Sequence, residues 1–303
     1  MDRRGFILGS VSGAVAGLSV GGFRALAQEA PKPDAETSKA KAVLKLCSRE
    51  NIIPGNSLAE KIENMKKFGG VGMEFLHGWD GKIAEIKAAL KGTGIGIGAL
   101  AFGSCPLIDP DKAVRDEGAA KLKEMLSKAG ELGGTGVIVI PRAKAKDAQP
   151  GWDEGRKILM DVLPAIGEHA VKAGSRIVFE PLNKGETKFL KRVDQAAELC
   201  KAVASPGVCL MGDFFHMAKE GEDDEKSFLA ADGYLHNVHL ASRGRFLPGQ
   251  DDLSFVAGFR GLKKIGYQDY CSLECKAAKG TDPMIEIPKS FALLRKQWDE
   301  AIV

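Results

Sequence analysis

This sequence lacks a large excess of positive or of negative charge. Its 303 residues hold 43 Lys and Arg against 40 Asp and Glu, a formal net charge of +3. Loss of residues 1–27 would remove three arginines and one aspartate, which lowers the net charge to +1. Such a balance offers no electrostatic attraction for nucleic acid or for an anionic membrane surface. We therefore expect neither class of partner.

Cysteine is also too sparse to build the fold. Six cysteines in a chain of this length do not form a disulfide scaffold, and their spacing does not match a zinc ribbon. Cys271 and Cys275 would share one face of an extended strand. We expect most of the six to be small buried hydrophobic residues.

The longest apolar run is confined to the N-terminus. Arg3 and Arg4 precede a Gly- and Ala-rich apolar segment that runs to Phe23, and residues 25–27 (ALA) have the form of a signal peptidase site. Residues 1–27 resemble a twin-arginine export signal, which implies a periplasmic or otherwise exported protein with no stable membrane insertion after cleavage. An uncleaved N-terminal anchor is the alternative. Residues 28–42 are a polar linker, and the folded body spans 43–303.

The body alternates short apolar runs with amphipathic segments. Helical spacing of apolar residues occurs between the runs and in a final segment at 286–302. This alternation predicts one parallel (β/α)8 TIM barrel, with a doubly wound open sheet as the alternative. No G-x-G-x-x-G follows the first run, so a dinucleotide crevice is not supported. The eight predicted strands are 42–48, 70–76, 94–102, 135–141, 175–181, 207–213, 235–241 and 269–275.

Four polar residues lie at or near the ends of the last four predicted strands. Glu180, Asp213, His239 and Glu274 could each point into the barrel mouth, where the active sites of such barrels lie. Singly, each has an ordinary explanation: a salt bridge, a helix N-cap or a packed histidine. Together, three converging carboxylates would repel one another unless a divalent cation binds them. This ligand set suits Mn²⁺, Mg²⁺ or Co²⁺.

At these residues the sequence resembles the xylose isomerase-like TIM barrels, in particular the sugar epimerases of the D-tagatose/D-psicose 3-epimerase type and the hydroxypyruvate isomerase-like proteins. The spacings between the four residues are 33, 26 and 35, similar to the metal-ligand spacing of that family. The likeness extends from residue 71 to the final helix. It is carried by FEPLN (179–183), GDFFHM (212–217), VHLASRGRFLPGQDDLSF (238–255) and IGYQDYCSLEC (265–275).

The resemblance implies roles for particular residues. Glu180 and Glu274 would be both metal ligands and the acid/base pair. Substrate-binding residues would be Glu186, His216 and Arg245, although the segment after His239 departs from the family pattern. Because of that departure, Arg243 is an alternative to Arg245. In the loop 141–155, Trp152 could line a sugar face or pack on the surface.

These residues would support proton abstraction next to a carbonyl, with a divalent metal stabilising the enediolate. The leading hypothesis is a metal-dependent isomerase or epimerase acting on an unphosphorylated sugar, keto-sugar or small hydroxy-carbonyl compound. One alternative is a lyase that cleaves 3-keto-glycosides by β-elimination. An endonuclease IV-like phosphodiesterase would need a basic groove and more metal-binding histidines than the five histidines of this chain supply. A non-catalytic sugar-binding barrel would not need both glutamates. A homo-oligomer is a further open expectation.

Overall fold

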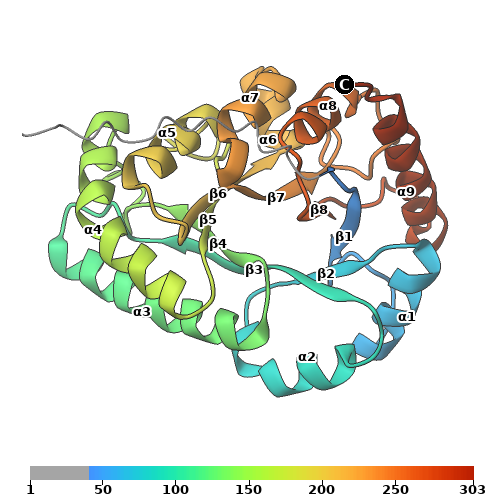
Figure 1. Ribbon diagram of the computed structural model, residues 1–303, viewed down its shortest axis with the longest axis horizontal. Coiled ribbons are helices and arrows are strands. Elements are labelled where there is room, and N and C mark those ends of the chain that lie inside the picture. Colours follow the sequence, from blue (N-terminus) through green and yellow to red (C-terminus); the bar gives the residue numbers. More distant parts are fainter. Residues whose placement is uncertain (1–40) are drawn as a thin grey trace, which may run out of the picture. The chain divides into compact units, whose positions relative to one another are not determined.

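The computed structural model describes residues 41–303, and its eight strands form a closed parallel barrel in chain order. Each strand pairs with the next, and β8 pairs with β1. The predicted (β/α)8 TIM barrel is thereby confirmed, and the open-sheet alternative is wrong (Figure 1). The strands are β1 (Lys45–Arg49), β2 (Gly72–Phe75), β3 (Gly96–Cys105), β4 (Gly136–Pro141), β5 (Ile177–Phe179), β6 (Val208–Asp213), β7 (Leu235–Leu240) and β8 (Tyr270–Leu273).

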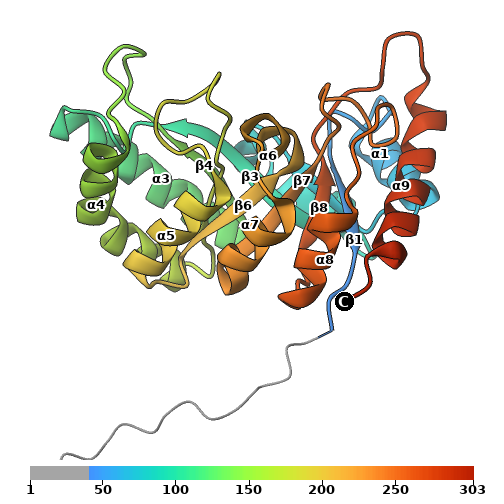
Figure 2. The ribbon, with the colours of Figure 1, turned by 90° about the horizontal axis from the view of Figure 1, so that it is seen from above.

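Helices surround the barrel, and the loops after β4 and β5 rise together from one of its ends (Figure 2). Two short helices, α6 and α7, follow β6 and were not predicted, because neither is long enough to show an amphipathic period. The helices are α1 (Leu58–Phe68), α2 (Ile83–Leu90), α3 (Lys112–Leu132), α4 (Trp152–Lys172), α5 (Val193–Val203), α6 (Phe214–Glu220), α7 (Asp224–Ala231), α8 (Val256–Lys264) and α9 (Pro283–Glu300). Two 3₁₀ turns span Trp79–Gly81 and Asp232–Tyr234.

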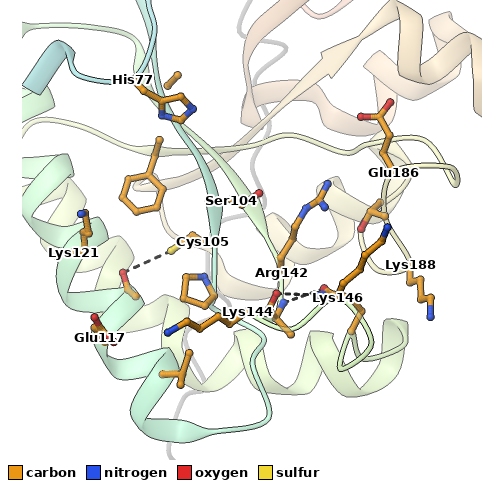
Figure 3. A pocket seen from close by; sticks show the side chains of 18 of the residues that line it. His77, Ser104, Cys105, Glu117, Lys121, Arg142, Lys144, Lys146, Glu186 and Lys188 are labelled. Atoms are coloured by element: carbon orange, nitrogen blue, oxygen red, sulfur yellow. Dashed lines mark hydrogen bonds between the residues drawn. The ribbon is translucent and has the colours of Figure 1, made fainter.

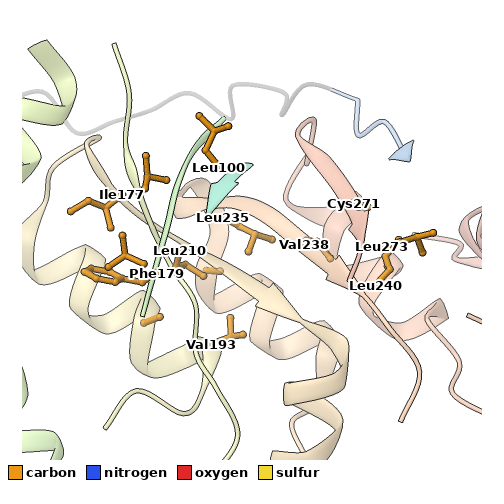
Figure 4. Packing of buried hydrophobic residues seen from close by; sticks show 14 of the residues in the cluster. Leu100, Ile177, Phe179, Val193, Leu210, Leu235, Val238, Leu240, Cys271 and Leu273 are labelled. Carbon is orange, nitrogen blue, oxygen red and sulfur yellow. The ribbon is translucent and has the colours of Figure 1, made fainter. Parts of the chain in front are cut away.

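Alternation along the strands separates two apolar layers. Ile177 and Phe179 of β5 belong to the large cluster between strands and helices, with residues of β6, β7 and β8 (Figure 4). Val178 lies on the opposite face, in a small cluster inside the barrel with Ala99, Ile138 and Met211. Since successive side chains of a strand point to opposite faces, every second residue of these strands points into the barrel.

Strand register brings the inward-facing polar residues to one level. Asp213 pairs with His239 across β6 and β7, and His239 pairs with Ser272 across β7 and β8. Glu180 directly follows β5, and Glu274 directly follows β8. The carboxyl end of the barrel therefore collects side chains from four neighbouring strands.

Several predictions about the chain's ends and cysteines can be compared with this structure. The predicted signal at 1–27 and nearly all of the linker at 28–42 lie outside the described residues, so both stay predictions. Within 41–303, no helix combines the length and apolar character needed to cross a bilayer. All six cysteines carry free thiols, and all but Cys275 are buried, which confirms the expectation of small buried residues.

Candidate metal centre and active site

Four side chains converge at the carboxyl end of the barrel. Glu180, Asp213, His239 and Glu274 each offer one ligand atom, and these atoms all lie within 4.8 Å of one another. His239 Nδ1 is 2.7 Å from Glu274 Oε2, 3.6 Å from Glu180 Oε1 and 3.7 Å from Asp213 Oδ2. The structure thus brings together all four residues predicted as metal ligands.

The ring of His239 is oriented by Glu74 of β2. Its Nε2 lies 3.0 Å from Glu74 Oε2, and because a carboxylate only accepts, Nε2 carries the proton in this bond. Glu74 Oε1 accepts from Asn237 Nδ2 at 2.9 Å, which fixes the carboxylate. Nδ1 is left buried with no hydrogen-bond partner among the residues described. In the neutral ring that a metal ion would bind, the lone pair of Nδ1 would therefore point at the three carboxylates.

This donor set fits a divalent cation. An imidazole lone pair that faces three carboxylate oxygens is electrostatically unfavourable unless a positive charge lies between them. One nitrogen and three oxygens form the kind of ligand set that Mn²⁺, Mg²⁺ or Co²⁺ takes. A carboxylate that binds the other ring nitrogen of a ligating histidine is typical of protein metal sites.

Asp213 has two tasks at the N-terminus of α6. Its Oδ1 accepts from the backbone N–H of Phe215 at 2.8 Å and so caps the helix, while Oδ2 faces the cluster. The N-cap explanation of this residue is therefore confirmed for Oδ1, and Oδ2 is left to face the predicted metal site. The cap holds the carboxylate in a single orientation.

The carboxyl groups of the cluster have unequal proton affinities. Burial raises the pKa of Glu180, but the nearby ring of His239, which carries a positive charge when it is protonated, outweighs burial and lowers the pKa. For Asp213, burial is outweighed by the charge of Arg245, and its pKa falls well below the usual range. Burial prevails at Glu274 and raises its pKa. The pKa of His239 is raised: burial lowers it, but the charges of neighbouring carboxylates, Glu74 first, prevail.

Two arginines partly offset the negative charge. Arg245 Nη1 lies 2.7 Å from Asp213 Oδ2, and its Nη2 binds Glu274. Arg49, at the end of β1, binds the other oxygen of Glu274. Four carboxylates face two arginines here, so a divalent cation would bring the cluster close to neutrality. The carboxylates are Glu74, Glu180, Asp213 and Glu274.

Arg245 is the arginine of the site, and Arg243 is not. The Arg245 backbone adopts φ 61°, a left-handed conformation that is uncommon for a residue other than glycine. Its guanidinium lies 4.5 Å from the ring centre of Phe215, which supports it from one side. Arg243 is largely exposed and points to Asp252 at 3.8 Å, so the alternative assignment is wrong in its placement.

His216 lies in the first turn of α6 and presents its ring nitrogen Nε2 to the cluster. Its Nδ1 accepts from the backbone N–H of Asn183 at 3.2 Å, so the neutral ring carries its proton on Nε2. That Nε2 lies 4.0 Å from Glu180 Oε1 and 3.8 Å from Asp213 Oδ2. The third predicted substrate residue, Glu186, is half-exposed at the rim and accepts from Asn183 Nδ2 at 2.7 Å. It does not enter the metal cluster.

Comparison with known proteins gives this architecture a family. Residues 62–297 match the family model described as xylose isomerase-like TIM barrel. The chain belongs to the xylose isomerase-like TIM barrel family. The resemblance inferred from the sequence is thereby confirmed.

Named relatives of this xylose isomerase-like barrel are sugar epimerases. It is 27% identical to 3-dehydro-D-guloside 4-epimerase of Escherichia coli over 83% of this chain and 99% of that protein. L-ribulose 3-epimerase of Mesorhizobium japonicum is also 27% identical, over 68% and 69% of the two chains. The crystal structure of 3-keto-D-glucoside 4-epimerase from E. coli superposes with a TM-score of 0.73 at 25% identity, over 84% of this chain and 100% of that one.

Three residues of the barrel mouth were missed by sequence reasoning. Glu74 lies near the end of a predicted strand, as His239 does, Arg49 directly follows a predicted strand, and Asn183 is part of FEPLN. The residues predicted as ligands came only from the last four predicted strands. Applied to all eight, the choice of polar residues at or near strand ends would have selected Glu74 and Arg49.

A large cavity adjoins the centre on the side of β3, β4 and β5. Its volume is about 1270 Å³, and Glu186 is one of its lining residues (Figure 3). Trp152 does not line it: the indole stacks on Phe189 with ring centres 5.4 Å apart. Packing, the second of the two interpretations of Trp152, is therefore correct.

Proposed function

We propose that this protein is a divalent-metal-dependent sugar epimerase that removes and returns a proton next to the carbonyl of an unphosphorylated keto-sugar. The observation that carries the proposal is the cluster of Glu180, Asp213, His239 and Glu274, in which two glutamates flank one set of ligand atoms. The relatives named above act on keto-sugars or ketoses, which supports this substrate class. The proposed reaction belongs to the isomerase class of enzymes.

Mn²⁺, Mg²⁺ or Co²⁺ would be held by Glu180 Oε1, Asp213 Oδ2, His239 Nδ1 and Glu274 Oε2. Such an ion acts as a Lewis acid that stabilises negative charge developing on the substrate oxygens. Glu74 keeps the proton of His239 on Nε2 and so leaves Nδ1 free as a ligand. Arg49 holds the oxygen of Glu274 that faces away from His239.

Glu180 and Glu274 form the proposed proton-transfer pair. They come from the ends of β5 and β8, which are not neighbours in the barrel, so their carboxylates approach the substrate from different sides. One removes the proton, and the other returns a proton to the opposite face, which inverts the carbon. Transfer between adjacent carbons on one face would instead give aldose–ketose isomerisation. The epimerases among the relatives favour inversion.

Three further residues would orient the substrate. His216 Nε2–H can donate to a substrate oxygen beside Glu180, because its other nitrogen is occupied by Asn183. Arg245 offers a charged donor near Asp213 and Glu274. Glu186, at the rim, can accept from a hydroxyl.

The alternatives receive less support. Elimination from a 3-keto-glycoside needs the same proton abstraction, but the relatives named above are epimerases rather than lyases. An endonuclease IV-like site requires more histidines than His216 and His239, the two that face this cluster. A non-catalytic sugar-binding barrel would not require both Glu180 and Glu274.

Incubation in D₂O tests the proposal. Metal-loaded protein is mixed separately with ketohexoses, hydroxypyruvate and 3-keto-glucosides, and deuterium is located by NMR. Deuterium on a carbon beside the carbonyl, together with the epimeric sugar, is expected, and a chelator should abolish it reversibly. Release of an aglycone without exchange would favour the lyase, while absence of exchange from all compounds would refute the epimerase.

We also propose export through the twin-arginine signal at residues 1–27. The support is the sequence alone: Arg3 and Arg4 before an apolar segment, then ALA at 25–27. Substitution of both arginines by lysine should move the protein from the periplasmic to the cytoplasmic fraction of the producing cell. An unchanged distribution would contradict this route.

A further inference from the structure

The cavity beside the metal centre is larger than one sugar needs. Its volume of about 1270 Å³ exceeds the range of about 300–1,000 Å³ that is usual for pockets holding drug-sized ligands. It lies at the ends of β3 and β4 and along the loop after β5 (Figure 3). A monosaccharide bound to the metal ligands would leave most of this space empty.

The cavity approaches the proposed substrate side of the centre at Glu186, whose Oε1 lies 3.8 Å from His216 Nδ1. Glu186 lines it and accepts from Asn183, and Asn183 in turn binds His216. His216 Nε2 faces Glu180 and Asp213. Glu186 and His216 are therefore the residues that a substituent extending from the metal-bound sugar toward the cavity would pass.

Positive charge dominates the lining. Six cationic side chains face four carboxylates, and one of these carboxylates, Asp80, is already bound to Lys128 at 3.3 Å. None of the six cations has a carboxylate within 4.0 Å in the part of the chain that the structure describes. They are Lys121, Arg142, Lys144, Lys146, Lys184 and Lys188. The carboxylates are Asp80, Glu117, Asp147 and Glu186.

The backbone of Arg142 is held in place on both sides. Arg142 directly follows β4, and its backbone N–H donates to the carbonyl of Cys105 at 2.9 Å. Its carbonyl accepts from Ile108 N–H, so both sides of the residue are fixed to the segment around β3. The side chain extends toward the side of Glu186 (Figure 3), and its Nε is buried without a hydrogen-bond partner within residues 41–303. This one N–H of the guanidinium therefore lacks an acceptor within the described chain.

Apolar side chains also line the cavity, beside the charged Glu117 and Lys121 of α3. Phe102 and Pro106 come from β3 and the turn after it, and Val114 and Met125 come from α3. A sugar ring has an apolar C–H face and polar edges, so it can lie against these apolar side chains while a charged substituent points to the cations.

We propose that this cavity binds a second sugar residue that carries an acidic group and is linked to the keto-sugar at the metal centre. Arg142 binds the acidic group, because its planar guanidinium matches carboxylate and sulfate oxygens in a bidentate manner. The shared chemistry is a compact oxyanion, either a uronate carboxylate or a sulfate ester. This inference rests on the proposed epimerase function and defines its substrate as an acidic disaccharide unit.

The test uses matched 3-keto-glucosyl disaccharides and the metal-loaded full chain. The second residue is glucose, glucuronate or glucose 6-sulfate in the same linkage, and kcat/KM is measured from deuterium exchange. We expect at least about a tenfold preference for one acidic compound over the neutral one, as a charge-assisted hydrogen bond provides. The glucuronate and sulfate arms identify the oxyanion. In Arg142→Gln, the ratio of kcat/KM between the acidic and the neutral disaccharide should fall close to one.

Arg156→Gln is the control, since Arg156 lies on α4, pairs with Glu198 and does not line the cavity. It should retain the preference. Equal kcat/KM for all three disaccharides in the wild type, or a preference that survives Arg142→Gln, would overturn the inference and leave the epimerase intact. If no compound exchanges, the epimerase proposal fails, and calorimetry of the unoxidised disaccharides decides the subsite. Binding of an acidic disaccharide that is lost in Arg142→Gln then supports the subsite. Equal affinities for the acidic and neutral disaccharides overturn it.

Discussion

Glu74→Gln should weaken metal binding although Glu74 is not a proposed ligand. The carboxylate accepts from His239 Nε2–H and from Asn237 Nδ2, at 3.0 and 2.9 Å. Glutamine offers one oxygen to these two donors and removes a negative charge that raises the basicity of His239. Glu74 is only 2% exposed, so solvent does not screen this loss.

The expected loss of affinity is about 10- to 100-fold, or about 1.4–2.8 kcal/mol, the usual effect of removing such a partner of a ligating histidine. Asn237 Oδ1 has no hydrogen-bond partner in the described chain, so this amide can turn and offer its oxygen to the new NH₂ group. Only the loss of charge then remains, which favours the lower end of the range.

Calorimetric titration of Mn²⁺ into chelator-stripped protein measures this effect, with near-UV circular dichroism as the test of folding. Glu222→Gln is the matched control, because Glu222 is a partly buried carboxylate that accepts from Ser227 at 2.8 Å and lies outside the cluster. Its Mn²⁺ affinity should equal that of the wild type. An affinity of Glu74→Gln within twofold of the wild type would refute the argued role of Glu74.

Three further predictions concern activity, pH and packing. Glu180→Gln and Glu274→Gln should each lower exchange at least about 10³-fold without unfolding the protein, because each removes one proton-transfer group. Burial raises the pKa of Glu222 from 4.5 to about 7. The folded state therefore retains a proton that the unfolded chain releases, and stability should fall by about 2 kcal/mol as pH rises through this interval, but not in Glu222→Gln. Gly130→Ala should cost about 1–3 kcal/mol, since its Cβ would collide with the carbonyl oxygen of Ala173.

Each of these has a clear contrary result. Exchange above one tenth of wild type in either glutamine variant would exclude that residue from proton transfer. Parallel pH profiles of the free energy of unfolding in wild type and Glu222→Gln would refute the shifted pKa. Gly233→Ala, with open space around its Cβ, should change stability by less than about 0.5 kcal/mol. Equal stability losses in Gly130→Ala and Gly233→Ala would contradict the collision.

The barrel and the four residues that meet at its mouth were predictable because both follow from strand alternation. An apolar run with period two identifies a strand, and the residue that ends it on the inward face points to the barrel mouth. Glu180 shares its face with Val178, and that face is the interior. His239 and Glu274 follow from the same count, and Arg245 from the spacing of the family motif.

The rest depends on contacts that no local pattern encodes. Arg243 and Arg245 have the same side chain two residues apart, and only the folded loop shows that Arg245, with its left-handed backbone, reaches the cluster. The cavity is lined by segments that lie far apart in the sequence. Its positive charge arises only in the folded chain, where Arg142 and Lys188, 46 residues apart, line the same space. Short helices such as α6 lack the length to display a period.

Anomalous diffraction from crystals soaked in Mn²⁺ tests the central claim most directly. The account predicts one strong peak per chain, about 2.2 Å from Glu180 Oε1, Asp213 Oδ2, His239 Nδ1 and Glu274 Oε2. A map without a peak among these four atoms, or with its strongest peak elsewhere on the chain, would contradict it.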